Sequence, residues 1–190
     1  MSPKAGLDKA KVVEAAADLV NAEGIEALTL SRLAGQLGVR TPSLYNHIDG
    51  LPGLQRELAL LSVRHLGERL GDAAIGKSGP QAVTAIAQAL RDYIKTYPGL
   101  YQTGLRPSPG DAEFQATQAR VVEIVMAVMA SFGLEGEDGL HAVRGLRSVV
   151  HGFATLEVAG GFGLPLDLDE SFRHLVDMLI RGLQGPAVRS

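Results

Sequence analysis

The chain has 190 residues, no cysteine and a formal net charge of −3 at pH 7. This length is enough for one substantial core, or for a small module joined to a larger one. The lack of cysteine excludes a disulfide framework, a thiol redox switch and a cysteine-ligated zinc site. The N-terminus has no signal-peptide pattern, and no stretch reaches the roughly 18 uninterrupted apolar residues of a membrane span. We therefore expect a cytoplasmic protein with no membrane partner.

Charge is distributed unevenly along the chain. Residues 1–56 contain six Lys and Arg against six Asp and Glu, so this part is neutral and the acidic excess lies in the remainder. The apolar residues recur with a helical period, Gly and Pro fall mostly between the apolar runs, and the alternation typical of strands is absent. The sequence therefore predicts an all-α fold of about nine helices.

The first three predicted helices are closely spaced. They cover residues 8–23, 30–37 and 42–48, with turns at Gly24 and Gly38. Thr29 is expected to cap the second helix and Thr41 the third, in which Pro42 takes the first position. Two short amphipathic helices that meet at one glycine are typical of a helix-turn-helix.

Six further helices form a larger C-terminal bundle in this prediction. They cover residues 50–70, 80–97, 98–105, 111–132, 137–160 and 169–183. Asp169 is expected to cap the last of them. The long helix that begins at residue 50 is expected to join the N-terminal module to this bundle.

The outer face of the third helix carries side chains that can read a DNA groove. Ser, Thr and Asn reach base edges in the major groove, and the ring of Pro can touch a thymine methyl group. Tyr and His can hydrogen-bond to flanking phosphates. The alternative for Tyr45 and His47 is a partly buried place at the elbow of the motif. The residues of this expected reading face are Arg40, Thr41, Pro42, Ser43, Tyr45, Asn46 and His47.

Residues 12–54 resemble the DNA-binding part of the TetR family of bacterial regulators. The matching positions are Ala16, Ala17, Leu19, Glu23, Gly24, Ile25, Leu28, Thr29, Leu33, Ala34, Leu37, Gly38, Val39, Leu44, Tyr45 and His47. The resemblance implies a homodimer with two DNA-binding heads, an operator of two half-sites, and a C-terminal pocket whose small-molecule effector changes the spacing of the heads. By the same analogy Thr29, Ser31 and Arg32 support the reading helix. We therefore expect a DNA-binding domain at residues 1–50 and a ligand-sensing and dimerisation domain at residues 51–190.

Two positions depart from the family pattern. Leu51 stands where the family usually has a Lys that contacts phosphate, and Ile48 stands where it often has Phe. Ile48 is a tolerable change in the core. Loss of the Lys is expected to weaken backbone affinity and lower its salt dependence unless another cation replaces it. The candidates for that role are Lys4, Lys9, Lys11 and Arg56.

Part of the C-terminal bundle resembles a regulatory domain subtype named for a Trp-His-Gly motif. The similar stretches are residues 97–101, 151–153 and 156–157, and Val150 stands where that motif has Trp. An effector pocket there would be apolar with few polar groups. For the aromatic and Met side chains the alternative is ordinary core packing, and for His151 it is a hydrogen-bonded core position. The candidate pocket residues are Tyr93, Tyr97, Tyr101, Phe114, Met126, Met129 and His151.

The last two predicted helices carry more apolar surface than one core can cover. In the first of them apolar residues wrap far round the helix, and the second has a stripe with the i, i+3, i+4, i+7 spacing. Packing against the same two helices of a second copy would give a two-fold symmetric interface. The residues expected there are Val143, Val150, Phe153, Ala154, Phe172, Leu175 and Leu179.

The favoured interpretation is a transcriptional repressor that a small-molecule effector releases from double-stranded operator DNA. A helical interaction module that has lost specific DNA binding is one alternative, which Leu51 and the neutral N-terminal part keep open. A small helical enzyme is another, but the sequence has no convincing spacing of catalytic or metal-binding residues. His174 and Asp177, one turn apart, lack a third ligand. We therefore expect no enzymatic activity, no cofactor and no metal.

Overall fold

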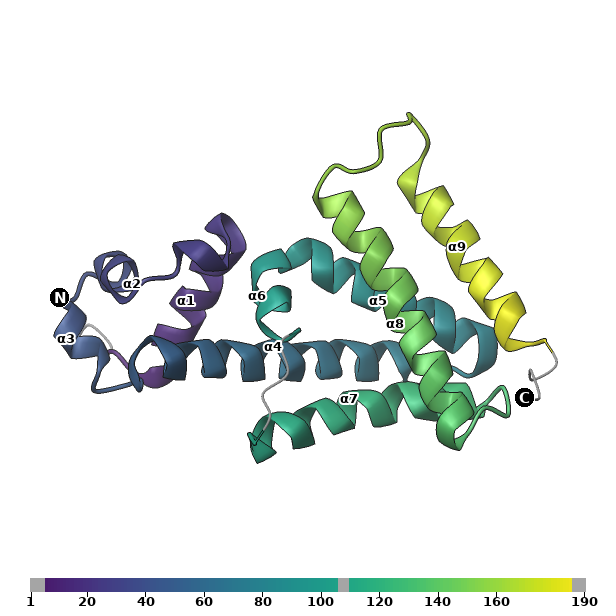
Figure 1. Cartoon of the computed structure of the whole chain (residues 1–190), viewed down its shortest axis with the longest axis horizontal. Helices are drawn as coiled ribbons and strands as arrows, with labels where there is room; N and C mark the ends of the chain where they lie inside the picture. Colours follow the sequence, from purple (N-terminus) through teal and green to yellow (C-terminus); the bar gives the residue numbers. More distant parts are fainter. Residues whose placement is uncertain (1–5, 106–109, 186–190) are drawn as a thin grey trace. The chain divides into compact units, whose positions relative to one another are not determined.

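The structure, a computed structural model, describes residues 6–105 and 110–185, and its regular elements are all helical (Figure 1). This confirms the all-α class. In chain order the elements are α1 (Lys9–Glu23), the short 3₁₀ helix η1 (Ile25–Ala27), α2 (Leu30–Leu37), α3 (Thr41–Leu44), α4 (Gly50–Ala74), α5 (Gly79–Thr96), α6 (Pro98–Thr103), α7 (Ala112–Ala130), α8 (Gly136–Val158) and α9 (Leu168–Leu183). No helix in the described ranges is long and apolar enough to cross a bilayer.

The chain forms two compact units. We call Met1–Arg64 together with Tyr97–Phe114 the head unit, and His65–Thr96 together with Gln115–Ser190 the body unit. The border between them falls inside α4, and α6 belongs to the head unit because it packs on α1 and η1. These packing units therefore differ from the expected division at residue 50. Whether DNA binding and ligand sensing divide at that residue stays a prediction.

The helices of the head unit enclose one apolar core. It is built from α1, the helix-turn-helix, the first turns of α4 and one residue of α6, and its fully buried members include Val12, Leu33, Leu44, Leu54 and Leu58. Ile48 lies in this core with 5% of its surface exposed, as expected for a tolerable apolar replacement. Leu51 packs against the edge of the same core, so the residue that replaces the expected Lys has a packing role.

Three details of the predicted helices are wrong. The helix after the turn at Gly38 begins at Thr41, one residue before its predicted start. Thr41 is therefore not its N-cap. Arg40 is the N-cap residue, and its side chain makes no capping hydrogen bond. This helix ends at Leu44 instead of residue 48, and the backbone N–H groups of His47 and Ile48 both donate to the Leu44 carbonyl. Helix α4 runs four residues past its predicted end.

The cap of α9 is also a correction. The side chain of Asp167 accepts the N–H of Glu170 at 2.8 Å, so Asp167 is the cap and the prediction of Asp169 is wrong. Asp169 instead lies in the first turn and pairs with Arg91. The predicted cap lies two residues too late because the sequence offers two aspartates at this helix start, and either has the side chain of a good cap.

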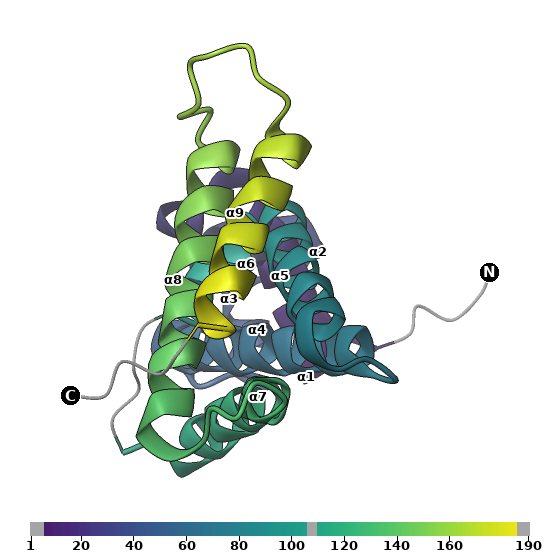
Figure 2. The same ribbon diagram turned by 90° about the vertical axis from the view of Figure 1, so that its right-hand side faces the viewer.

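The body unit is built on contacts among α5, α8 and α9, with α7 and the last turns of α4 beside them. Helices α8 and α9 run side by side in both views, joined by an extended connection (Figure 1 and Figure 2). The core of this unit includes Ile86 and Tyr93 of α5, Met129 of α7, Val150 of α8 and Phe172 of α9. At the crossing of α5, α8 and α9 the buried Arg91 pairs with Glu157.

This ion pair makes the stability of the protein depend on pH. The guanidinium of Arg91 is the main group that holds the pKa of Glu157 below its usual range; Lys95 acts in the same direction and burial acts against both. Because the folded pKa is the lower one, the contribution is complete above the usual glutamate pKa of about 4.3 and is lost as pH falls through the folded value. Asp169 of α9 also contacts the same guanidinium.

We expect the free energy of unfolding of the wild type to approach that of Glu157→Gln as the pH is lowered from about 6 to about 3. Urea titrations of both proteins across this range measure the difference. A difference that stays constant with pH would show that the ionisation of Glu157 contributes nothing to folding.

Candidate nucleic-acid interface

Local hydrogen bonds fix the geometry of the helix-turn-helix. The hydroxyl of Thr29 accepts the N–H of Arg32 at 3.2 Å, which caps α2 as predicted. Gly38 ends α2 with a φ of 68°, in the left-handed region that glycine adopts without steric cost. The N–H of Val39 then donates to the Ala34 carbonyl and turns the chain toward α3. Leu33 and Leu44 anchor the two helices to the core.

The expected reading face is accessible. Arg40, Pro42, Tyr45 and Asn46 are exposed, and Thr41, Ser43 and His47 are half-buried. Tyr45 exposes 59% of its surface, so packing within the head unit does not account for an aromatic side chain at this position. All seven residues lie in α3 or beside it. The structure therefore brings together hydroxyl, amide, imidazole and phenol groups on one small surface.

The supporting residues of α2 have different surroundings. Ser31 is exposed, whereas the hydroxyl of Thr29 is already used in the cap. Arg32 donates to the carboxylate of Glu23 at the end of α1. To contact DNA, the guanidinium of Arg32 must therefore either bind Glu23 and DNA at the same time or break its contact with Glu23.

Most cations of residues 6–64, the described first part of the head unit, have an acidic neighbour. Lys9 pairs with Glu57 at 2.7 Å, and Lys11 lies 3.5 Å from Asp8. Arg40 is the one cation of residues 6–64 for which the structure shows no ion pair. Lys4, the remaining candidate for replacing the missing Lys, lies outside the described residues. Residues 6–64 of the head unit therefore offer the phosphates of DNA few positive charges that are not already paired.

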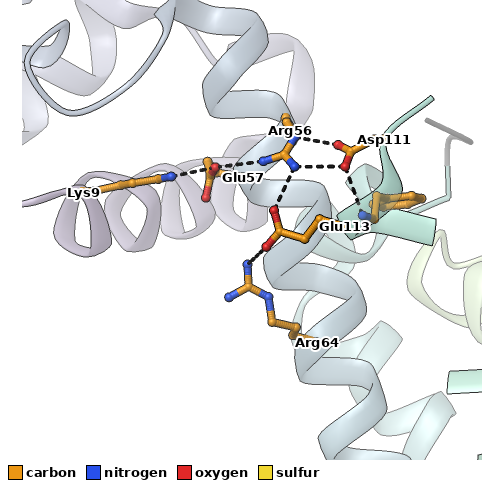
Figure 3. A network of polar contacts seen from close by, with 7 residues as sticks. Lys9, Arg56, Glu57, Arg64, Asp111 and Glu113 are labelled. Carbon is orange, nitrogen blue, oxygen red and sulfur yellow. Dashed lines mark hydrogen bonds and ion pairs between the residues drawn. The ribbon is translucent and has the colours of Figure 1, made fainter. Parts of the chain in front are cut away.

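Arg56 belongs to an ion-pair network that ties α4 to the start of α7 (Figure 3). Its guanidinium donates to both carboxylate oxygens of Asp111, at 2.6 and 2.9 Å, and to Glu113 at 2.9 Å. The carboxylate of Asp111 also accepts the backbone N–H of Phe114. These partners lower the pKa of Asp111, chiefly through the hydrogen bond from Arg56. A paired Arg56 is poorly suited to replace the Lys absent at position 51.

A second contact ties α6 to α1. The side-chain oxygen of Asn21 accepts the N–H of Leu100 at 2.8 Å. Next to it, Gly99 approaches the α1 backbone so closely that a Cβ there would lie 1.9 Å from the Val20 carbonyl oxygen. Only a residue without a side chain fits at this crossing. Residues 97–114 are thus fastened to the rest of the head unit near both ends.

The candidate pocket residues divide between the two units. Tyr97, Tyr101 and Phe114 belong to the head unit, and the other four to the body unit. Tyr93, Tyr101, Phe114 and Met129 are at most 3% exposed, and Met126 packs on Gly139 of α8. His151 is half-buried; burial, and to a lesser extent the charge of Arg147, lower its pKa. Within the described residues no three acidic, His or Cys side chains are grouped to hold a metal.

Four of the residues expected at the dimer interface are in the protomer's own core. Val150, Phe153, Ala154 and Phe172 are at most 9% exposed. They pack inward because α8 and α9 turn these faces toward α5. Val143, Leu175 and Leu179 are half-buried. The exposed apolar side chains of these two helices are instead Leu140, Leu156, Val158 and Met178.

The sequence alone did not predict the residues that hold residues 97–114 against the rest of the head unit. Asn21, Gly99 and Asp111 act through contacts between segments 55 to 79 residues apart along the chain. For Gly99 a signal was present, since a glycine inside a predicted helix is unfavourable by about 1 kcal/mol relative to alanine and can indicate close packing. Nothing in the local pattern signals the partners of Asn21 or Arg91.

Comparison with known proteins identifies transcriptional regulators similar to this chain. A family model described as Tetracyclin repressor-like, C-terminal domain, matches residues 83–179. The chain is 33% identical over 184 residues to the uncharacterized HTH-type transcriptional regulator YobS of Bacillus subtilis, covering 96% of both chains. It is 34% identical over 182 residues to another uncharacterized HTH-type transcriptional regulator, from Mycobacterium tuberculosis, covering 95% of this chain and 83% of that one.

A similar fold is seen in a solved structure. It is a TetR variant of Acinetobacter baumannii AYE in complex with minocycline, with a TM-score of 0.71 and 24% sequence identity. The match covers 94% of this chain and 97% of that one. At this level of identity the likeness concerns the fold of the whole chain.

Proposed function

Since the chain belongs to the TetR family of transcriptional regulators, we propose that it is a homodimeric repressor that a small-molecule effector releases from its operator. The observation that carries the proposal is the exposed surface around α3, where Tyr45 is 59% exposed and six other groups suited to groove or phosphate contacts surround it. The residues proposed to contact DNA are those seven, with Ser31 and Arg32 of α2 in support.

The position of residues 97–114 supports effector control. This segment is part of the head unit, yet it is continuous in sequence with α5 and with the part of α7 from Gln115 onward, which belong to the body unit. A ligand that displaces either helix would pull on a segment fastened at Asn21 and at Arg56. Under this proposal those contacts are the route by which the effector state reaches the helix-turn-helix.

The candidate pocket residues indicate a class of ligand. The solved relative binds minocycline, and the candidate residues in α5, α7 and α8 of this chain are apolar or aromatic apart from His151. We propose an apolar or aromatic effector with few polar groups, and a regulatory domain of the Trp-His-Gly subtype. His151 is its proposed polar anchor.

The dimer is proposed to form through the outward face of α8 and α9. The exposed apolar side chains of these two helices are Leu140, Leu156, Val158 and Met178, and Leu175 and Leu179 are half-buried. Binding of a second copy through these helices would remove apolar side chains from water. A second copy bound through the same face gives the two-fold symmetry that a two-half-site operator requires.

Selection of duplexes from a random DNA pool with the purified full-length chain tests the proposal. We expect enrichment of an inverted repeat, and a specific shift of the selected duplex that a scrambled duplex of equal length does not compete away. DNA from immediately upstream of the chain's own coding sequence provides an independent probe. Lack of any enriched sequence at low salt would reject the repressor and favour the interaction-module alternative.

The salt dependence of binding follows from the paired cations. With Arg40 as the one cation of residues 6–64 without an ion pair, a dimer should release few counterions from DNA. We expect the slope of log K against log salt to be about −2 to −4. Fluorescence anisotropy with the selected duplex between about 50 and 200 mM salt measures it. A slope steeper than about −7 would mean that the paired cations, Arg56 included, contact phosphates after all.

A further inference from the structure

A single buried cation joins three helices of the body unit. The side chain of Arg91 on α5 is 2% exposed. Its Nε and Nη2 donate to the two carboxylate oxygens of Glu157, both at 2.8 Å, and its Nη1 lies 2.8 Å from Asp169. All three guanidinium nitrogens therefore have a carboxylate partner. Glu157 is on the last turn of α8, and Asp169 on the first turn of α9.

Aromatic rings surround the same guanidinium. Its Cζ lies 4.7 Å from the ring centre of Phe172 on α9 and 5.4 Å from that of Phe153 on α8. The two rings are themselves 5.2 Å apart. Cation–π contacts of this kind are stronger where water is excluded. We call Arg91, Glu157, Asp169, Phe153 and Phe172 the Arg91 cluster.

The Arg91 cluster joins the two ends of the connection between α8 and α9. Residues 159–167, which connect the two helices, have no regular structure, and all of them are exposed. Glu157 and Asp169 stand just before and just after this connection, so one side chain of α5 holds both of its ends. Phe162 is the part of the connection that returns to the cluster, 4.8 Å from the ring of Phe153.

A buried charged cluster contributes little to net stability. The loss of hydration of both charges offsets much of their attraction, and apolar replacements of similar size are often neutral or stabilising. What a bidentate guanidinium provides is direction, since its planar donors accept carboxylates in one geometry. Apolar side chains in the same place would pack without such a directional requirement.

We propose that Arg91 is a positioning residue that sets the register of α9 on α8, and through it the shape of the face that a second copy binds. The second part of this inference rests on the dimer proposed above. The first part concerns α8 and α9 of one chain, and it can be tested whether or not the protein dimerises.

The decisive variant is Arg91→Met with Glu157→Leu, which removes both buried charges together. We expect its melting temperature to stay within a few degrees of the wild type or to rise. At the same time we expect amide hydrogen exchange in residues 168–183 to be faster by about tenfold or more, and the dimer dissociation constant from sedimentation to rise by a similar factor.

The matched control is Lys95→Met. Lys95 also contacts Glu157, at 2.6 Å and through the same Oε1 that Arg91 Nη2 binds, but its side chain is 41% exposed and no contact of it with α9 is seen among the described residues. This variant should leave exchange and dimerisation unchanged. If it reproduces the double variant, the charge balance at Glu157 is responsible and the role of Arg91 is overturned.

The remaining outcomes are also decisive. Unchanged hydrogen exchange in α9 of the double variant overturns the inference. A fall in melting temperature large enough to account for the faster exchange also overturns it, because the cluster would then act only on stability. A monomeric wild type rejects the dimer proposal, and hydrogen exchange alone then decides the role of Arg91 in α9 register.

Discussion

Replacement of Gly99 by alanine is expected to lower the free energy of unfolding by about 3 kcal/mol. The added Cβ would lie 1.9 Å from the carbonyl oxygen of Val20, 2.3 Å from its carbonyl carbon and 2.9 Å from the Asn21 nitrogen. All three atoms are backbone, so no side-chain rotation relieves the overlap. Helix α6 must move away from α1, which also breaks the hydrogen bond from Leu100 to Asn21. Urea unfolding followed by circular dichroism measures the loss.

A glycine of the same unit provides the control. Gly35 lies in α2 without a positive φ, and apart from its chain neighbours and its own helix backbone no described atom lies within 4 Å of the position that a Cβ would take there. Gly35→Ala should therefore stabilise the protein by about 0.5–1 kcal/mol, through helix propensity and reduced freedom of the unfolded chain. If Gly99→Ala proved as harmless as this control, the close crossing of α6 and α1 would be wrong.

The combined change Tyr45→Phe and His47→Ala is expected to weaken binding of the selected duplex by about 100-fold or more. It removes one hydroxyl and one imidazole from the surface around α3. In a dimer each loss occurs twice, and a charged or polar contact to the phosphate backbone is worth roughly 1 kcal/mol. Tyr45 is 59% exposed, so the free energy of unfolding should change by less than about 0.5 kcal/mol. Fluorescence anisotropy gives the affinity and urea unfolding the stability.

A side chain of similar exposure but without a proposed role serves as the comparison. Ile75 is 73% exposed in the turn between α4 and α5, and Ile75→Ala should leave DNA affinity unaltered. Equal affinities of the wild type and the Tyr45, His47 variant would mean that the exposed surface around α3 does not contact DNA. A loss of affinity accompanied by unfolding would instead assign these residues to stability.

The sequence was sufficient to predict a structural feature wherever that feature depends on hydrogen bonds and backbone geometry within one short segment. The cap at Thr29 and the left-handed turn at Gly38 were predicted at the residues where they occur. Both depend on neighbours within a few positions, a hydroxyl that reaches a free N–H and a backbone without a Cβ. The outward placement of Tyr45 followed in the same way, because Leu33 and Leu44 set which side of the helix-turn-helix is buried.

The sequence was less informative where equivalent residues compete. Two aspartates lie at the start of α9, and either could cap it from the local pattern alone. Asp167 does so, whereas Asp169 is bound by Arg91 from α5. Likewise, the apolar stripes of α8 and α9 were recognised, but Val150 and Phe172 face the protomer's own core. Periodicity indicates that a face is apolar and does not indicate which partner covers it.

By itself, then, the sequence determined the all-helical class, the helix-turn-helix with its cap and turn, and the family, because these depend on contacts between residues close together in the chain. Tertiary structure decided which cations are already paired, that residues 97–114 fold with the head unit, and that one arginine holds both ends of the α8–α9 connection. Those features depend on side chains tens of residues apart that meet only in the folded protein. No local pattern of charge or hydropathy specifies such partners.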